Sequence, residues 1–196
     1  MRDRMRHGSR ARSAAADAAA ARLSRVTAGP TANRGEPIRL LFVCMGNICR
    51  SPTAEAVMRR LLREEGLEEA IEVDSAGVGD WHAGQPPDQR AAAAASARGL
   101  TLEGTARAIA PRDFEDYDLI LAADRRNVRD LEVVTPPGAR ARIHLLREFD
   151  PQSAGAPDLD VPDPYYGGDD GFERVLDLVD AACRGLLDEL RARGRV

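Results

Sequence analysis

A cysteine, an arginine and a serine stand close together in the segment CMGNICRS, residues 44–51. The apolar run IRLLFV precedes Cys44 and a helical pattern begins at Ser51, so the residues between them must turn the chain from a strand into a helix. Gly46 and Asn47 tolerate the unusual backbone angles that such a turn requires. We expect successive backbone N–H groups to point inward, which makes the turn a cradle for an anion at the start of a helix.

The chemistry that suits this cradle is nucleophilic attack on a bound oxyanion. Arg50 presents a planar fork for two oxygens of a phosphate-like group, which a lysine would not match. The same positive ends favour the thiolate form of Cys44, and Ser51 can donate a further hydrogen bond to its sulfur. Such a thiolate is a nucleophile aimed at the central atom of the bound group. A nucleotide-binding P-loop is excluded because its second glycine and its Lys-Ser/Thr pair are missing.

A thiolate that attacks a phosphate ester also needs an acid to protonate the departing oxygen. The segment DVPDPYYGG, residues 160–168, offers Asp163, which its neighbour Pro164 biases toward an extended backbone. Tyr165 and Tyr166 follow directly. An acid beside two aromatic rings suits an aryl phosphate, because the rings can flank the body of the substrate while the acid protonates its phenolic oxygen.

Short apolar runs alternate with helical patterns from Ile38 onward, as in βαβ units around a parallel sheet. We predict strands over 38–43, 71–77, 117–124 and 141–149, and helices over 51–66, 86–99, 124–133 and 172–193. Ser51 is the expected N-cap of the first helix, with Pro52 at its first position. The fold class is α/β, a single doubly wound domain with a four-stranded parallel sheet and the phosphate-binding loop after strand one. Ligands should therefore bind at the carboxyl ends of the strands.

The first 36 residues differ from the rest in composition. They hold eight arginines against three acidic residues and show no sustained apolar periodicity. We predict a disordered, Arg- and Ala-rich tail over residues 1–36 and a folded domain over residues 37–196. Two alternatives for the tail stay open, namely an organellar targeting segment and a translation start further along, near Val26.

Charge and cysteine content limit the possible partners and the compartment. Since the whole chain carries −4 and residues 1–36 carry +5, residues 37–196 carry −9, which argues against a nucleic-acid-binding surface. No apolar run approaches the length of a membrane span. The 3 cysteines, at unmatched spacings, do not make a secreted disulfide framework. We therefore expect a cytoplasmic protein that binds neither nucleic acid nor membrane.

The two motifs together resemble the low-molecular-weight protein tyrosine phosphatases of the bacterial type. Cys44, five intervening residues, Arg50 and Ser51 match the phosphate loop of that family, and Asp-Pro-Tyr-Tyr at 163–166 matches its acid motif. The resemblance implies a hydrolase in which Cys44 is phosphorylated, Arg50 binds the phosphoryl oxygens, and Asp163 acts as general acid and later activates water. It implies neither metal nor organic cofactor, phosphotyrosine-containing proteins as substrates, and a monomer or weak dimer.

The resemblance also extends to residues around the catalytic trio. The segment SAGVGDWHAG resembles the rim of the cleft in bacterial members, which puts Trp81 and His82 near the entrance, although a place for Trp81 in the core stays open. Asn47 and Ser51 correspond to side chains that hold the loop and assist the thiolate. The residues expected to contact substrate are Met45, Gly46, Asn47, Ile48, Cys49, Ser51, Trp81, Tyr165 and Tyr166.

The remaining cysteines and histidines raise further possibilities. Cys49 lies in the same loop as the nucleophile and could form a reversible disulfide with it, a bridge that protects related phosphatases from overoxidation. The simpler interpretation is that Cys49 only fills the loop. A zinc site that includes Cys44 and Cys49 lacks the paired spacings of true zinc sites, and we predict no metal. His144 and Cys183 are expected to be structural.

Three alternative functions stay open. An arsenate reductase would need two further relay cysteines, which the chain lacks. A protein-arginine phosphatase resembles the same fold, but its members carry threonine at the position of Ile48 and an acid motif without the tyrosine pair. A non-catalytic phosphate-binding module would not need both Cys44 and Asp163. The sequence therefore favours phosphotyrosine hydrolysis.

Overall fold

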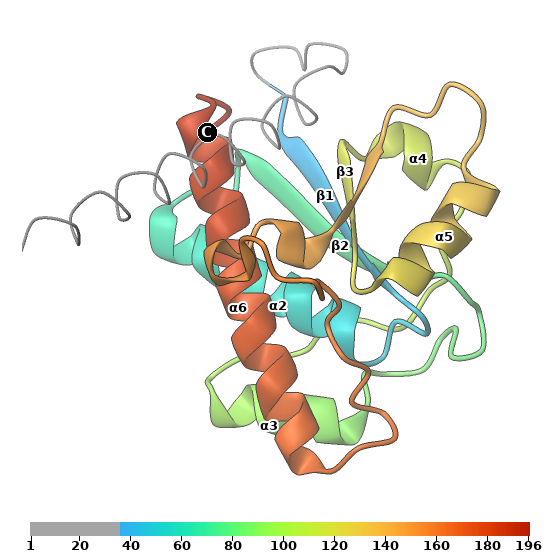
Figure 1. The fold of residues 1–196 in the computed structure, drawn as a ribbon, viewed down its shortest axis with the longest axis vertical. Helices are drawn as coiled ribbons and strands as arrows, with labels where there is room; N and C mark the ends of the chain where they lie inside the picture. The colour runs from blue at the N-terminus through green and yellow to red at the C-terminus, as the bar shows by residue number, and fades with distance from the viewer. Residues whose placement is uncertain (1–35) are drawn as a thin grey trace, which may run out of the picture. The chain divides into compact units, whose positions relative to one another are not determined.

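The computed structural model of the protein describes residues 36–196, so the predicted tail lies outside the described residues except for Glu36. The described chain alternates strands and helices, with two short 3-10 turns after the last strand (Figure 1). The elements in chain order are β1 (Ile38–Cys44), α2 (Arg50–Glu65), β2 (Ile71–Gly77), α3 (Gln89–Ala97), α4 (Asp113–Asp116), β3 (Leu119–Ala122), α5 (Arg125–Val134), β4 (Arg142–Leu145), η1 (Leu146–Glu148), η2 (Pro151–Ser153) and α6 (Asp169–Ala192).

The four strands form one sheet in the order β2-β1-β3-β4, and every neighbouring pair is parallel. This confirms the predicted doubly wound α/β fold. The chain leaves β1 to one side for β2 and later returns to its other side for β3, so the strand order reverses at β1. Ligands of such sheets bind at the carboxyl ends of the strands where the order reverses. Cys44 ends β1 at this point, and Asp124 is the second residue after β3.

Alternating side chains of the buried strands supply two apolar layers. Leu41 and Val43 of β1 pack into one cluster with Phe114 of α4 and Leu131 of α5. On the other face, α2 and α6 pack against each other, and Phe42 borders the same small space as residues of both helices. The central strands β1 and β3 are therefore covered on both faces, which explains their mostly apolar sequences.

Several predicted boundaries were wrong for identifiable reasons. The helix expected from residue 86 begins at Gln89, because the side chain of Asp88 caps it by accepting hydrogen bonds from the N–H groups of Arg90 and Ala91, at 2.8 and 3.4 Å. The strand expected over 141–149 ends at Leu145, where η1 begins. The short helix α4 was not predicted, and at four residues it is too short for apolar periodicity to reveal it.

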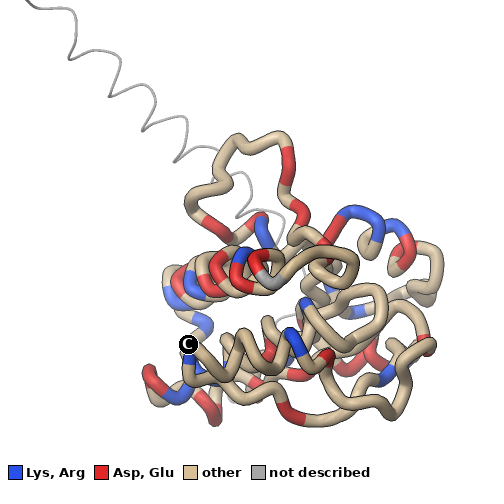
Figure 2. The backbone as a smooth tube through the Cα atoms, turned by 90° about the horizontal axis from the view of Figure 1, so that it is seen from below, with Lys and Arg blue, Asp and Glu red and all other residues tan. Residues whose placement is uncertain are grey.

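Ion pairs link α6 to its neighbours at the surface. Arg191 pairs with Glu65 of α2 at 2.8 Å, and Arg98, just after α3, pairs with Asp177 at 2.6 Å. Figure 2 shows acidic and basic positions interspersed along the described backbone. Exposed pairs of this kind contribute at most about 1 kcal/mol each, so apolar packing provides most of the stability. Among residues 36–196, no helix is both long and apolar enough to cross a membrane.

Candidate active site

The loop between β1 and α2 is held in its turn by the side chain of Asn47. Asn47 has a φ of 56°, in the left-handed region that few non-glycine residues adopt. Its amide nitrogen donates to the hydroxyls of Ser51 and Ser75 at 2.9 and 2.8 Å, and its amide oxygen accepts from the backbone N–H of Arg107 at 2.9 Å. Three hydrogen bonds to separate segments therefore fix the strained residue of the loop.

Arg107 is itself fixed by carboxylates on the side away from the loop. Its guanidinium bonds Asp74 at 2.8 Å and Asp113 at 2.9 Å, and Asp74 also accepts from the hydroxyl of Tyr117 at 2.9 Å. Burial opposes the charged form of Asp74, but the hydrogen bonds from Arg107, from the Ser75 N–H and from Tyr117 hold the pKa of Asp74 below its usual value. Burial and the negative charge of Asp74 raise the pKa of Tyr117 to about 12, so its hydroxyl stays a donor.

Ser51 lies in the second position of α2 and does not cap the helix, contrary to the sequence prediction. Its hydroxyl oxygen lies 3.1 Å from the sulfur of Cys44, accepts from Asn47, and lies 3.3 Å from the carbonyl of Ala76. The helix begins at Arg50, and Cys49 at the N-cap position makes no side-chain hydrogen bond to the first turn. The side chain of the N-cap residue therefore leaves the N–H groups at the start of α2 unoccupied, as an anion site requires.

Arg50 is buried and reaches two carboxylates at once. Its Nη1 donates to Asp124 at 2.6 Å and to the carbonyl of Val161 at 3.2 Å, while its Nη2 donates to Asp163 at 2.9 Å. Burial opposes its charged form, but the negative charges of Cys44, Asp163 and Asp124 outweigh burial and raise the pKa of Arg50. The guanidinium thus remains charged and oriented at the carboxyl edge of the sheet.

Asp124 is a site residue that the sequence prediction missed. It follows β3 and caps α5 by accepting from the N–H of Asn127 at 2.7 Å, while its other oxygen holds Arg50. Its place at the end of the third strand, next to the point where the strand order reverses, could have marked it as a site residue. An aspartate before a helix is, however, sufficiently explained as an N-cap, so its position alone did not indicate a role in the site.

Asp163 lies across the cavity from the loop, with its side chain 42% exposed. One carboxylate oxygen accepts from Arg50 and the other accepts from the backbone N–H of Tyr165 at 3.1 Å. The structure thus brings Asp163 next to the arginine that follows the loop, although the two residues are far apart in sequence.

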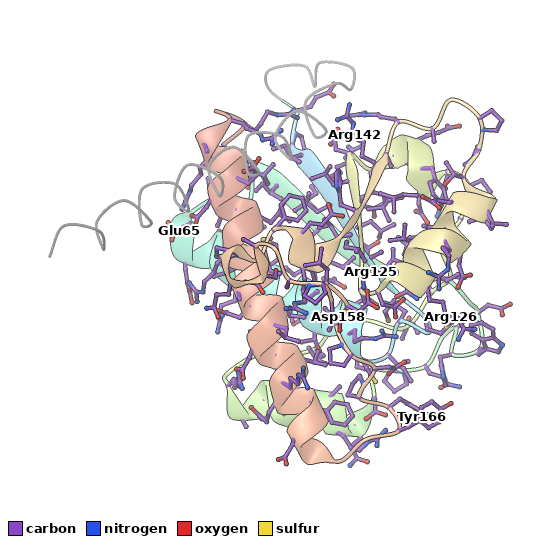
Figure 3. The ribbon with its side chains drawn as sticks, in the orientation of Figure 1. Glu65, Arg125, Arg126, Arg142, Asp158 and Tyr166 are labelled. Carbon is purple, nitrogen blue, oxygen red and sulfur yellow. The ribbon has the colours of Figure 1, made fainter. Side chains whose placement is uncertain are left out.

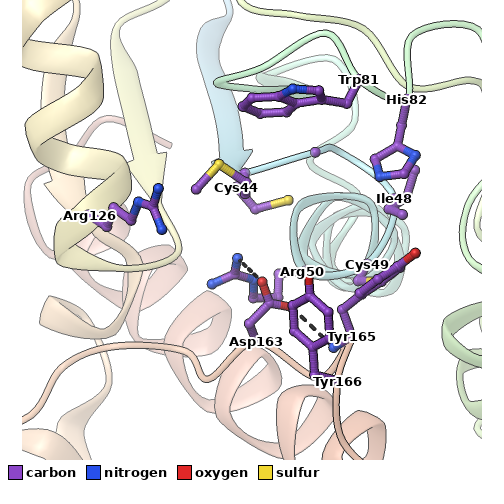
Figure 4. Close-up of a pocket in the computed structure, with 12 residues that line it drawn as sticks. Cys44, Ile48, Cys49, Arg50, Trp81, His82, Arg126, Asp163, Tyr165 and Tyr166 are labelled. Atoms are coloured by element: carbon purple, nitrogen blue, oxygen red, sulfur yellow. Dashed lines mark hydrogen bonds and ion pairs between the residues drawn. The ribbon is translucent and has the colours of Figure 1, made fainter.

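A cavity of about 430 Å³ opens above the loop (Figure 4). Ten predicted residues line it, and Asn47 and Ser51 instead support the loop from behind. His82, expected near the entrance, also lines the cavity, and Arg126 of α5 is a lining residue that the sequence prediction missed. The predicted residues that line the cavity are Cys44, Met45, Gly46, Ile48, Cys49, Arg50, Trp81, Asp163, Tyr165 and Tyr166.

Aromatic side chains form the rim of this cavity. Trp81 is 67% exposed, which rules out the alternative that it fills the core, and Tyr166 is 92% exposed. The rings of Tyr165 and Tyr166 meet edge to face with centroids 5.0 Å apart, and the ring of His82 lies 6.3 Å from that of Tyr165. Exposed aromatic rings around a polar base are suited to hold a flat aromatic group.

The two other cysteines are buried thiols. Burial raises the pKa of Cys49 to about 12, and the negative charges of Asp88, Cys44 and Asp163 add to this effect. Burial also raises the pKa of Cys183, which is fully enclosed on α6 and makes a weak contact of 3.8 Å with the carbonyl of Ala54. Cys49 alone of the two lines the cavity.

Comparison with known proteins places this site in a family. Residues 39–196 match the family model described as low molecular weight phosphotyrosine protein phosphatase. A low molecular weight protein-tyrosine-phosphatase of Streptomyces coelicolor is 47% identical over 154 residues, covering 78% of this chain and 93% of the relative.

Two crystal structures illustrate the likeness. A protein tyrosine phosphatase of Entamoeba histolytica superposes with a TM-score of 0.74 at 38% identity, over 80% of this chain and 99% of that one. A Drosophila arginine phosphatase superposes with a TM-score of 0.71 at 32% identity, over 77% of this chain and 96% of that one. The chain belongs to the low molecular weight phosphotyrosine protein phosphatase family.

Proposed function

We propose that the protein is a protein-tyrosine phosphatase that hydrolyses phosphotyrosine, and small aryl phosphates, through a phosphocysteine intermediate. The observation that carries this proposal is the placement of Cys44, Arg50 and Asp163 around one cavity with an aromatic rim. Cys44 lies in the loop at the base, Arg50 beside it, and Asp163 opposite, where a leaving oxygen would depart.

In the first step, the thiolate of Cys44 attacks phosphorus, so a sulfur–phosphorus bond forms as the bond from phosphorus to the tyrosine oxygen breaks. The hydroxyl of Ser51, 3.1 Å from the sulfur, stabilises the negative charge on the thiolate. Arg50 and the loop N–H groups hold the oxygens of the transferring group and spread its charge. Asp163, in its protonated form, donates a proton to the departing phenolic oxygen.

In the second step, water attacks the phosphocysteine and the sulfur–phosphorus bond breaks. The carboxylate left on Asp163 accepts a proton from the attacking water, which restores the acid and releases phosphate. Asp163 therefore serves both steps from one position, as microscopic reversibility of the proton transfer requires. Cys44 is regenerated as a thiolate.

The aromatic rim favours an aryl ester over an aliphatic one. Tyr165 and Trp81 can contact the phenyl ring of a substrate whose phosphoryl group reaches the loop. Ile48 is buried beside them and presents an apolar surface to the ring rather than a hydroxyl. These side chains support phosphotyrosine over phosphoarginine, although the fold also hosts the Drosophila arginine phosphatase.

An arsenate reductase is the weaker alternative. Such an enzyme would pass oxidation to further cysteines, but Cys183 is fully buried on α6 and does not line the cavity. The described residues therefore offer Cys49 alone as a thiol partner for Cys44.

We further propose that the protein acts in the cytoplasm. Its 3 cysteines are all free thiols, and the proposed nucleophile is one of them. A reducing compartment keeps such a nucleophile active, whereas an oxidising one favours its loss to disulfides.

The experiment that tests the activity measures phosphate release from matched phosphotyrosine, phosphoserine and phosphoarginine peptides in EDTA. Wild type is compared with Cys44→Ser and with Cys183→Ala, a cysteine variant outside the cavity whose folding is checked by thermal melting. We expect phosphotyrosine turnover that is lost in Cys44→Ser and kept in Cys183→Ala. Cleavage of phosphoarginine alone would refute the roles of Ile48 and Tyr165, and no turnover of any peptide would refute the proposed activity.

A further inference from the structure

Arg126 is a cation in the cavity wall to which the proposed mechanism gives no role. It occupies the second position of α5 and lines the cavity on the side opposite Tyr165 and His82 (Figure 4). Its side chain is 71% exposed, and within residues 36–196 its one ion pair is a contact of 4.0 Å with Asp130. Most of its hydrogen-bonding capacity therefore faces solvent at the mouth of the cavity.

The arginines around Arg126 are engaged by the protein itself. Arg125 reaches Asp158 at 3.4 Å and the carbonyl of Pro157 at 2.8 Å (Figure 3). Arg90, near the tyrosine pair, bonds Asp88 at 2.9 Å. Their guanidinium groups hold loops and a helix start in place, whereas the guanidinium of Arg126 pairs, among the described residues, only with Asp130 of its own helix.

We propose that Arg126 selects substrates that carry an acidic side chain beside the phosphotyrosine, an inference that rests on the function proposed above. When a phosphotyrosine ring fills the cavity, the flanking peptide must cross its mouth, within reach of the wall on both sides. The planar fork of an arginine matches a carboxylate with two parallel hydrogen bonds. The first turn of α5 adds its own positive partial charge at the same place.

The charge of the whole domain predicts the opposite preference. Residues 37–196 carry −9, since the chain carries −4 and residues 1–36 carry +5, so the long-range field repels acidic peptides and attracts basic ones. A preference for acidic peptides must therefore come from a local contact. Within the cavity lining, the cations are Arg50, which holds two carboxylates, and Arg126.

The test uses the full-length chain and two pairs of phosphotyrosine peptides. One pair carries two aspartates or two lysines directly before the phosphotyrosine, and the other pair carries them directly after it. The measured quantity is the ratio of kcat/KM for the acidic peptide to kcat/KM for the basic one. It is determined for wild type, Arg126→Ala, Arg126→Glu and Arg129→Ala. Arg129 is a matched control because it is exposed on the same helix but does not line the cavity.

We expect wild type to favour the acidic peptide of at least one pair by roughly two- to fivefold, the size expected of an exposed charge pair. Arg126→Ala should lower this ratio to one or below, because the negative field of the domain then acts without the local contact. Arg126→Glu should lower the ratio further, and Arg129→Ala should leave it unchanged. The ratio should also shrink when about 0.5 M salt is added, because exposed charges are screened.

Three results would overturn the inference: no acidic preference in wild type, a preference that survives Arg126→Ala, or an equal loss in Arg129→Ala, which would mark a general field effect. Failure of the proposed function looks different. In that case neither the peptides nor an aryl phosphate would be turned over by wild type, and no ratio could be measured. Turnover without a ratio dependent on Arg126 refutes the selection alone.

Discussion

Asn47 offers the sharpest test of how the loop is built, because one residue carries both the backbone strain and the hydrogen bonds. Replacing it by alanine removes three hydrogen bonds of 2.8 to 2.9 Å, two of them buried and one partly buried. At about 1 kcal/mol each, their loss costs about 3 kcal/mol. Alanine at a φ of 56° adds about 1 kcal/mol, so we expect Asn47→Ala to lower the free energy of unfolding by about 4 kcal/mol.

The matched variant is Asn47→Gly, which loses the same hydrogen bonds but adopts the left-handed conformation freely. It should lose about 3 kcal/mol, roughly 1 kcal/mol less than the alanine variant. Ser75→Ala removes one of the three bonds, that to Asn47, and should cost about 1 kcal/mol. Urea unfolding, followed by circular dichroism, measures all three values.

The activity of the two Asn47 variants separates loop geometry from stability. Under conditions where both are folded, kcat/KM for an aryl phosphate should fall in both, because Ser51 loses the partner that orients its hydroxyl beside Cys44. Equal stabilities for glycine and alanine, or a loss below about 1 kcal/mol in both, would refute the strain and hydrogen-bond account of this loop.

Four further predictions concern the carboxylates and the second loop cysteine. Asp163→Asn should reduce kcat for phosphotyrosine by roughly 10²- to 10⁴-fold in steady-state assays. The loss of kcat should be smaller for p-nitrophenyl phosphate, because its leaving group needs less protonation. Equal losses for the two substrates would contradict the general-acid role. Asp124→Asn keeps an N-cap for α5 but removes the charge 2.6 Å from Arg50. We therefore expect kcat/KM to fall while the melting temperature barely changes. A large drop in melting temperature would assign Asp124 to stability instead. A pKa of about 12 keeps the Cys49 thiol protonated at neutral pH. In the Cys44→Ser variant, the rate at which iodoacetamide alkylates Cys49, measured by mass spectrometry, should therefore be low at pH 7 and rise steadily toward pH 12. Fast labelling at pH 7 would refute the burial argument. Inactivation by peroxide should be reversed by a thiol reductant in wild type but not in Cys49→Ala, and equal reversal would exclude a protective disulfide.

The parts of the fold and site that could be predicted from sequence are those with a local signal. Short apolar runs that alternate with helical patterns indicate βαβ units, and this alternation predicted the four-stranded parallel sheet. Gly46 and Asn47 mark a tight turn, and Asp163 stands out because of its proline and tyrosine neighbours. Each of these signals lies within a few residues of the side chain concerned.

The parts that escaped prediction depend on contacts between distant segments. Asp124, which accepts a hydrogen bond from Arg50, lies 74 residues from it in the sequence. The hydrogen bond from the N–H of Arg107 to Asn47 joins residues 60 positions apart. Ser51 was assigned to the helix cap because hydroxyls before helices usually cap them. In this loop the hydroxyl faces Cys44 instead, and the start of α2 lacks a side-chain cap. A rule for ordinary helices fails where the helix start faces an anion site.

The charges of the site support the proposal that Asp163 enters the reaction as a neutral acid. With Cys44 as a thiolate, the groups around the cavity base carry one positive charge, on Arg50, against negative charges on Cys44, Asp124 and Asp163. A phosphate dianion would raise this excess of negative charge by two. Protonation of Asp163 removes one negative charge and also releases Nη2 of Arg50 to bind a phosphoryl oxygen. Asp124 accepts from the N–H of Asn127 at the start of α5 as well as from Arg50, so it can keep the guanidinium in place. In the proposed mechanism, substrate therefore displaces Asp163 from Arg50, while Asp124 continues to orient the guanidinium.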